Sequence, residues 1–259
     1  MKNILITGGS SGIGLAIARQ LANEGGWNIV SISRSPDKVK SAIARYPVLK
    51  DSVEFINGNV GSPDECGPIA KYLFDKYKVL HGLVNNAGML TSGGIHDINY
   101  ETWRSNLQVN LDAPYVLTQQ LLPMLKAAQQ ASVINISSIA SETPGRSIAY
   151  SVSKAGLDML TKFLAGELGP FKIRVNGISP GLVETSLHLD SKVITSEANY
   201  REMLLKSSEK YPIGRIGQPE DIAHLASFLL SEKSLWITGV IVKIDGGTSV
   251  FNEILPKKK

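Results

Sequence analysis

Cysteine is nearly absent from this sequence, since Cys66 is the only one in 259 residues. A lone thiol cannot form an internal disulfide, and this usage is typical of a reducing compartment. A strong excess of one charge is missing too: 27 Lys and Arg stand against 23 Asp and Glu, for a net charge of +4. Outside the terminal Lys257, Lys258 and Lys259, the basic residues are scattered. Charge this weak and diffuse argues against a nucleic-acid-binding surface.

Long hydrophobic runs are also missing. No uninterrupted apolar stretch approaches the roughly 18 residues that would indicate a membrane span. The chain enters a strand-like run four residues after its start, which leaves no room for a signal peptide. We therefore expect a cytoplasmic protein with no membrane or nucleic-acid partner. The histidines show no ligand spacing, so no metal site is expected; they are His81, His96, His188 and His224.

Apolar residues are plentiful, at 43% of the chain against 19% charged, which is enough for a sizeable core. Short runs rich in β-branched residues recur, and each is typical of a buried parallel strand. They lie at residues 4–7, 29–33, 53–56, 80–85, 133–137, 173–178 and 240–244. Segments of helical period separate them, which indicates βαβ crossovers. We predict one α/β domain over residues 1–250, a Rossmann-type doubly wound parallel sheet of about seven strands with helices on both faces.

Two stretches interrupt this alternation. Residues 181–210 are polar and rich in Ser, and we interpret them as an insertion that covers the substrate at the carboxyl edge of the sheet. Residues 251–259 form a short basic tail, which we expect to be solvated.

A glycine-rich turn, TGGSSGIG, occupies residues 7–14, directly after the first expected strand. Glycines let the backbone turn tightly and approach a pyrophosphate, and the N-terminus of the following helix favours an anion. A plain strand-to-helix turn would use glycine as well, but this position favours a dinucleotide site. The spacing TGxxxGxG differs from the more common GxGxxG. It resembles the short-chain dehydrogenase/reductase (SDR) family, in its classical branch.

Further segments resemble this family in the same order along the chain. The family carries an NNAG segment after the fourth strand, an Asn in the next helix and a Ser at the end of the fifth strand. A YxxxK pair on the following helix and a Pro-Gly turn ending in Thr complete the pattern. The matching residues are 85–88, Asn110, Ser137 with Ser138, Tyr150 with Lys154, and 180–185. With similar closing segments at 237–239 and 244–247, the resemblance covers residues 2–247.

The residue expected to transfer the proton is Tyr150. Tyr46 and Tyr72 also precede a Lys by four residues, but neither follows a serine-ending strand. Residues i and i+4 share a helix face, so Tyr150 and Lys154 are expected to present their polar ends to one cleft. A nearby ammonium favours a phenolate, and together with oxidised nicotinamide we expect Lys154 to lower the phenol pKa from its usual value near 10. The resemblance implies that Tyr150 is the general acid for ketone reduction and the general base for alcohol oxidation.

The resemblance implies roles for three more side chains. Ser138 would hydrogen-bond the substrate oxygen, Lys154 would hold the nicotinamide ribose hydroxyls, and Asn110 would fix a water that links Lys154 to solvent. The interval from Ser138 to Tyr150 is 12 residues, one shorter than is usual in the family, which leaves Ser137 as an alternative. We prefer Ser138, because it matches the second residue of the strand-ending pair and the following loop can absorb the missing residue.

The expected cofactor is NADP, with NAD as the alternative. NAD enzymes normally carry an acidic residue at the end of the second strand, whereas NADP enzymes place an Arg nearby for the additional phosphate. Here Ser33 stands at the acidic position and Arg34 follows it. Asn59 and Val60 resemble the family's adenine-contacting pair. The residues expected to bind the cofactor are Gly8, Ser10, Ser11, Gly12, Ile13, Gly14, Ser33, Arg34, Asn59, Val60, Asn86, Ala87, Gly88, Tyr150, Lys154, Pro180, Gly181, Val183 and Thr185.

The substrate is less well defined. The variable segments 90–98, 140–148 and 182–208 are expected to wall its pocket, and the apolar residues there suit a moderately apolar carbonyl compound. These residues are Met89, Leu90, Ile148, Leu182, Leu187 and Leu189. A 3-ketoacyl thioester reductase is one candidate. The alternatives to a carbonyl reductase are a catalytically silent NADP(H)-sensing protein and a sugar-nucleotide epimerase or dehydratase, and the retained Ser, Tyr and Lys favour turnover.

A homodimer or homotetramer is also expected. Family members commonly pair through the helix that carries the YxxxK motif. Here this helix has an apolar series that extends beyond one face, consisting of Ala155, Met159, Phe163 and Leu164.

Overall fold

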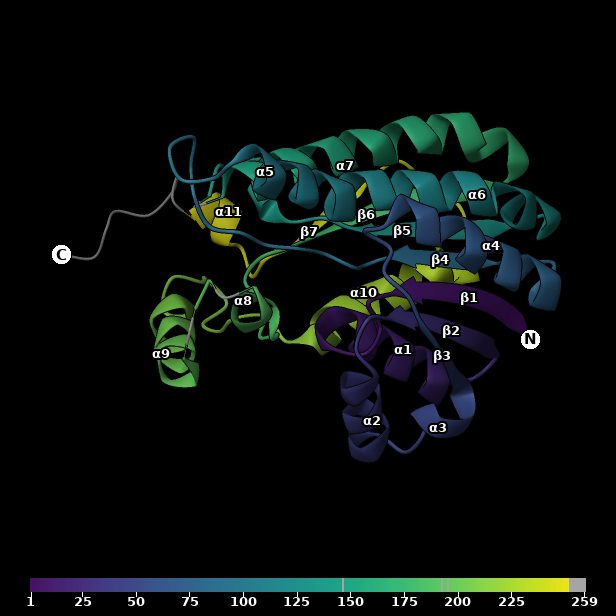
Figure 1. Ribbon diagram of the computed structural model, residues 1–259, viewed down its shortest axis with the longest axis horizontal. Helices are drawn as coiled ribbons and strands as arrows, with labels where there is room; N and C mark the ends of the chain where they lie inside the picture. Colours follow the sequence, from purple (N-terminus) through teal and green to yellow (C-terminus); the bar gives the residue numbers. More distant parts are fainter. Residues whose placement is uncertain (146, 192, 195, 252–259) are drawn as a thin grey trace.

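The structure is a computed structural model that describes residues 1–145, 147–191, 193–194 and 196–251. In this part of the chain, seven parallel strands form one sheet in the order β3-β2-β1-β4-β5-β6-β7 (Figure 1). They are β1 (Lys2–Thr7), β2 (Trp27–Ser33), β3 (Val53–Asn57), β4 (Gly82–Asn85), β5 (Ala131–Ile136), β6 (Ile173–Pro180) and β7 (Ile241–Ile244). The predicted doubly wound Rossmann-type fold is confirmed. The basic tail with Lys257, Lys258 and Lys259 lies outside the described residues.

Helices cover both faces of the sheet. The helices of the described residues are α1 (Gly12–Glu24), α2 (Pro36–Arg45), α3 (Leu49–Ser52), α4 (Pro63–Tyr77), α5 (Tyr100–Leu107), α6 (Ala113–Ala127), α7 (Ile148–Leu168), α8 (Leu187–Asp190), α9 (Glu197–Ser208), α10 (Pro219–Leu230) and α11 (Thr248–Phe251). Figure 1 shows α4, α6 and α7 on one face, and α1 and α10 on the other. None of the described helices is both long and apolar enough to span a bilayer.

The two faces of the sheet are buried in separate hydrophobic clusters. Leu5 of β1 packs with residues of α4, α6 and α7, whereas its neighbour Ile4 packs with residues of α1 and α10. Both side chains are completely buried. Successive residues of a strand point to opposite faces, so burial of both faces explains the nearly continuous apolar runs of the sequence.

The strand order reverses between β1 and β4, and this position determines where a ligand can bind. In an open parallel sheet the crossovers leave β1 and β4 toward opposite faces, which opens a crevice at the carboxyl ends of these strands. In Figure 1, α8 and α9 lie beyond this edge of the sheet. They belong to the segment 181–210 and have a small core of their own, in which Tyr200 and Leu204 pack against Tyr211 and Ile216.

Candidate active site

A cavity of about 1520 Å³ lies along the carboxyl ends of the strands. Ordinary small-molecule pockets measure roughly 300–1,000 Å³, so this cavity has room for a dinucleotide together with a second molecule. All the residues expected to bind the cofactor line it except Gly14, and all the expected catalytic residues line it except Asn110. The structure therefore brings nearly the whole predicted set together around one space.

The glycine-rich turn forms one wall of this cavity. Gly8 and Gly12 have φ angles of 70° and 52°, in the left-handed region that favours glycine. Ser11 precedes α1 but makes no capping hydrogen bond with its side chain, so the first N–H groups of the helix remain available to a ligand. Such an N-terminus suits a pyrophosphate, and the shape and the donor set of the turn fit a dinucleotide.

Gly14 is the one residue expected to bind the cofactor that is not among the lining residues of the cavity, and its contact with the cofactor stays a prediction. A Cβ atom at this position would lie 2.6 Å from the backbone oxygen of Gly8 and would collide with the amide nitrogen of Asn86. The side chain of Asn86 donates to the backbone oxygens of Thr7 and Gly8, at 2.8 and 3.3 Å. Gly14 is thus required for the close packing that holds the glycine-rich turn against the segment after β4.

Thr7 strengthens the same connection, although the sequence analysis assigned it no role. Its hydroxyl oxygen accepts hydrogen bonds from the backbone N–H groups of Asn86 and Ala87, both at 2.9 Å. The side chain is 2% exposed. Thr7 therefore joins the ends of β1 and β4 at the point where the crevice opens.

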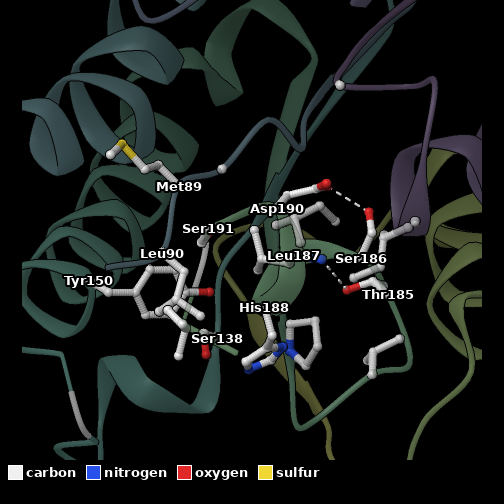
Figure 2. A pocket seen from close by; sticks show the side chains of 18 of the residues that line it. Met89, Leu90, Ser138, Tyr150, Thr185, Ser186, Leu187, His188, Asp190 and Ser191 are labelled. Carbon is white, nitrogen blue, oxygen red and sulfur yellow. Dashed lines mark hydrogen bonds between the residues drawn. The ribbon is translucent and has the colours of Figure 1, made fainter. Parts of the chain in front are cut away.

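Tyr150 and Lys154 come from the first two turns of α7, and Ser138 lies just beyond β5. Figure 2 shows Tyr150 and Ser138 next to one another at the cavity. The ammonium of Lys154 is buried and donates to the backbone oxygen of Ile136 at 2.8 Å. An ammonium has three N–H donors, so two remain for a ligand. These three side chains come from adjacent elements and meet on the wall opposite the glycine-rich turn.

The two candidate serines have different surroundings. The hydroxyl of Ser137 is buried and points to the backbone oxygen of Lys154, at 3.5 Å. The hydroxyl of Ser138 accepts from the backbone N–H of Ala140 at 3.2 Å, which leaves its own proton free to be donated. It is also close enough to Tyr150 to affect the pKa of the phenol. This geometry favours Ser138 as the residue that contacts a substrate oxygen.

Burial governs the pKa values of the central pair. It raises the pKa of the Tyr150 phenol above its ordinary value, and the hydroxyl of Ser138 opposes this rise. Burial lowers the pKa of Lys154 to about 8, against the opposing charge of Asp158. The expected lowering of the Tyr150 pKa is thus not found in the protein alone, because desolvation outweighs the hydrogen bond with Ser138. The expectation also counted the positive charge of the oxidised nicotinamide. A lowered pKa of Tyr150 in the complex with this cofactor therefore stays a prediction.

Asn110 lies behind the cavity, within a turn of π-helix at Gln108–Asp112 that separates α5 from α6. Its side-chain oxygen accepts from the N–H of Met89, and its nitrogen donates to the oxygen of Met89, both at 2.8 Å. The same nitrogen donates to the hydroxyl of Ser153 at 3.1 Å. The side chain is completely buried. Asn110 therefore connects the segment after β4 to α7 through its side chain, and its expected role in fixing a water stays a prediction.

The segment after β2 forms another wall of the cavity, at the end where the adenosine of a dinucleotide is expected. The hydroxyls of Ser33 and Ser10 are 2.6 Å apart, which joins this segment to the glycine-rich turn. Arg34 follows at the cavity wall. Lys38, on the first turn of α2, lines the same region, although it belongs to none of the sequence motifs. Its only signal was a second basic residue four positions after Arg34, on a helix that begins between them.

The segments expected to wall the substrate contribute both apolar and polar side chains to the cavity. Four of the six apolar residues expected there line the cavity, namely Met89, Leu90, Leu182 and Leu187. Leu189 packs instead in the core of the segment 181–210, and Ile148 is not among the lining residues. Among the polar residues there is His188, whose ring nitrogen Nδ1 is buried without a hydrogen-bond partner in the described part of the chain. Burial lowers the pKa of this imidazole, which keeps it neutral at pH 7.

Comparisons with known proteins agree with this geometry. A family model described as "Enoyl-(Acyl carrier protein) reductase" matches residues 8–249. The human protein "Dehydrogenase/reductase SDR family member 4" is 36% identical over 249 residues, which cover 95% of this chain and 87% of that protein. The "3-oxoacyl-[acyl-carrier-protein] reductase FabG" of Thermotoga maritima is 33% identical over 248 residues, which cover 95% of this chain and 97% of that protein.

A solved structure adds a likeness in three dimensions. It is a putative NAD(P)-dependent gluconate 5-dehydrogenase from Beutenbergia cavernae, determined with bound NADP. The TM-score is 0.85 at 28% sequence identity, and the alignment covers 96% of each chain. Both the sequence and the fold are therefore similar to those of known dehydrogenases and reductases over nearly their whole length.

Proposed function

Because this chain belongs to the short-chain dehydrogenase/reductase family, we propose that it is an NADP(H)-dependent oxidoreductase that reduces a ketone to a secondary alcohol, or catalyses the reverse reaction. The observation that carries this proposal is the arrangement of Ser138, Tyr150 and Lys154 around one cavity, opposite the glycine-rich turn. Single members of this set occur in many proteins, but their convergence on a space large enough for a dinucleotide points to one chemistry.

In the proposed reaction, the nicotinamide supplies or accepts the hydride when it is bound. Ser138 donates a hydrogen bond to the substrate oxygen and so holds this oxygen beside Tyr150. During ketone reduction Tyr150 gives its phenolic proton to the oxygen that becomes the alcohol, and during oxidation it takes this proton back. Lys154 has two unused N–H donors for the ribose hydroxyls, and its positive charge favours the phenolate form of Tyr150.

The use of NADP(H) rests on the segment after β2. Ser33 occupies the position where a carboxylate would bind the adenosine ribose, and Arg34 provides a positive charge next to it. The Beutenbergia protein, of similar fold, binds NADP. NAD(H) is the alternative. The two cofactors differ only in the phosphate on the adenosine ribose, which would lie at this end of the cavity.

The substrate is proposed to be a carbonyl compound with an apolar group, because Leu90 and Leu187 are among the residues that wall this end of the cavity. His188 adds one neutral polar group for a second contact. The name of the Thermotoga relative makes a 3-oxoacyl thioester one compound worth testing.

The proposal can be tested with a panel of ketones and secondary alcohols, including a 3-oxoacyl thioester, assayed with each cofactor. The absorbance of reduced nicotinamide reports turnover. We expect consumption of NADPH with at least one apolar ketone, and loss of this activity in Tyr150→Phe. If the protein binds NADPH tightly but turns over no member of the panel, the result would favour a silent cofactor sensor. Turnover that survives in Tyr150→Phe would assign the chemistry to other residues.

A further inference from the structure

An ion pair connects the cofactor end of the cavity to the segment over the substrate end. The ammonium of Lys38 lies 2.6 Å from a carboxylate oxygen of Asp190, the last residue of α8. The hydroxyl of Ser186 donates to the same carboxylate at 2.6 Å (Figure 2). Lys38 and Asp190 are 152 residues apart in the chain. This pair is therefore a contact that the tertiary fold brings about, between α2 and α8.

The carboxylate of Asp190 lies within the influence of two cations. Partial burial raises its pKa, but the hydrogen bonds from Lys38 and Ser186 lower it, as do the charges of Lys38 and Arg34, so that the net shift is downward. Arg34, Lys38 and Asp190 all line the cavity. The carboxylate of Asp190 thus lies where Arg34 and Lys38 would attract an anionic ligand, at the end of the cavity proposed for the adenosine.

We propose that Lys38 is, together with Arg34, the second cation for the 2′-phosphate of NADP(H), and that Asp190 takes the place of this phosphate in the cofactor-free protein. The inference rests on the proposed use of NADP(H). Binding of the phosphate exchanges one ionic partner of Lys38 for another, and it frees Asp190 and α8 from α2. Asp190 therefore lowers the affinity for NADP(H), whereas Lys38 and Arg34 raise it.

The exposure of the pair suits such an exchange. The side chains of Lys38 and Asp190 are 40% and 43% exposed, and an ion pair this exposed contributes little to stability. A phosphate monoester carries a charge of about −1.5 to −2 and three acceptor oxygens. It therefore binds two cations better than the single charge of a carboxylate does. NAD(H) has no phosphate at this position, so it leaves the pair of Lys38 and Asp190 in place.

The experiment measures the dissociation constants of NADPH and NADH by fluorescence titration, which needs no turnover. Lys38→Met is expected to weaken NADPH binding at least about tenfold, the effect of losing one charge-assisted hydrogen bond. NADH binding should stay within about twofold. Asp190→Asn is expected to tighten NADPH binding about threefold or more, because it removes the competing anion, and to leave NADH binding unchanged.

Matched controls come from α2. Lys40 and Asp37 form a long ion pair of 3.9 Å with side chains 80% and 94% exposed. Lys40→Met and Asp37→Asn therefore change the net charge of the protein by the same amounts as Lys38→Met and Asp190→Asn do. Both should leave the two dissociation constants unchanged. An equal loss in Lys40→Met and Lys38→Met would show a general charge effect and would overturn the inference.

Arg34→Ala separates the inference from the proposal on which it rests. If this variant loses NADPH affinity selectively while Lys38→Met does not, or if Asp190→Asn weakens NADPH binding, the cofactor assignment holds and the inference is wrong. If the wild-type protein binds NADH at least as tightly as NADPH, and Arg34→Ala affects both alike, the assignment of NADP(H) is itself wrong.

Discussion

Lys154 is 3% exposed, and its ammonium has one hydrogen-bond partner among the described residues, the backbone oxygen of Ile136 at 2.8 Å. A buried cation with so few partners is poorly compensated for the water that it has lost. Burial accordingly lowers its pKa to about 8. In the protein without cofactor, the residue that is proposed to hold the ribose thus destabilises the fold.

Replacement of Lys154 by Met should therefore stabilise the protein at pH 7. The folded pKa of about 8 lies below the unfolded value of 10.5, so between them the unfolded chain binds more protons and stability rises with pH. The destabilisation is fully present below about pH 8 and disappears above about pH 10.5. We expect the free energy of unfolding to rise by about 2 kcal/mol. Removal of the buried charge contributes about +3 kcal/mol, and loss of the hydrogen bond costs about 1 kcal/mol.

Urea unfolding at pH 7 and pH 10 measures this effect. The gain should be clear at pH 7 and small at pH 10. Lys162→Met is the control, because Lys162 is an exposed lysine on the same helix. A Lys154→Met protein that is less stable than the wild type at pH 7, or equally improved at both pH values, would contradict the proposed cost of the buried ammonium.

Tyr150→Phe removes only the phenolic oxygen, and turnover should fall at least about a hundredfold, the usual contribution of a general acid. The dissociation constant of NADPH should stay near that of the wild type, because the aromatic ring and Lys154 remain. Steady-state assays and fluorescence titration check the two expectations. The control is Tyr72→Phe, which changes a second YxxxK pair whose hydroxyl contacts Glu54 and should not affect turnover.

Ser138→Ala and Ser137→Ala distinguish the two serines. Ser138 has a free proton beside Tyr150, and the loss of such a donor to a reacting oxygen lowers kcat by about 10² to 10³. The hydroxyl of Ser137 points to the backbone of α7 at 3.5 Å. Its loss should lower kcat less than about tenfold and show mainly as reduced stability. If steady-state assays show the larger loss of kcat in Ser137→Ala, Ser137 is the residue that contacts the substrate oxygen.

The sequence predicted the elements of the sheet well, because strand periodicity is a local property. Both faces of β1 are covered, so its successive residues are apolar. Such a continuous apolar run can be recognised in the sequence alone. The spacing of Tyr150 and Lys154 on one helix was predictable for the same reason.

Contacts between distant segments could not be predicted in this way. The pair of Lys38 and Asp190 depends on how α8 folds over the edge of the sheet, and no local pattern encodes that placement. The close packing of Gly14 against Gly8 and Asn86 is likewise not reported by its place in the motif, because Asn86 lies on a distant segment. The pKa of Tyr150 depends on burial, which a spacing does not report.

Arg34→Ala should weaken the binding of NADPH by at least about tenfold and leave that of NADH nearly unchanged, because a charge-assisted contact to a phosphate is lost and NADH has no phosphate there. Competition between the two cofactors, followed by fluorescence, measures the ratio directly. Arg45→Ala, at the opposite end of α2, is the matched loss of one positive charge. Equal weakening of both cofactors would show that Arg34 contacts a part that they share.

The outer face of α7 leads to the last prediction, a symmetric dimer or tetramer. Val152, Met159 and Phe163 lie along this face, at 45%, 63% and 70% exposure. Leu164, expected in the same series, is instead buried in the core and does not belong to this face. Large apolar side chains that share one helix face typically mark an interface in an oligomer.

Sedimentation equilibrium at micromolar concentration should therefore find an oligomer of the wild-type protein. Met159→Glu combined with Phe163→Glu places two charges on this face of α7 and should shift the protein to a monomer, because an unpaired charge is expensive to bury in an interface. Leu205→Glu is the control, since Leu205 is 71% exposed on α9, away from α7. If the wild type sediments as a fully active 27.9 kDa species, the monomer is sufficient and the exposed face of α7 has no role in assembly.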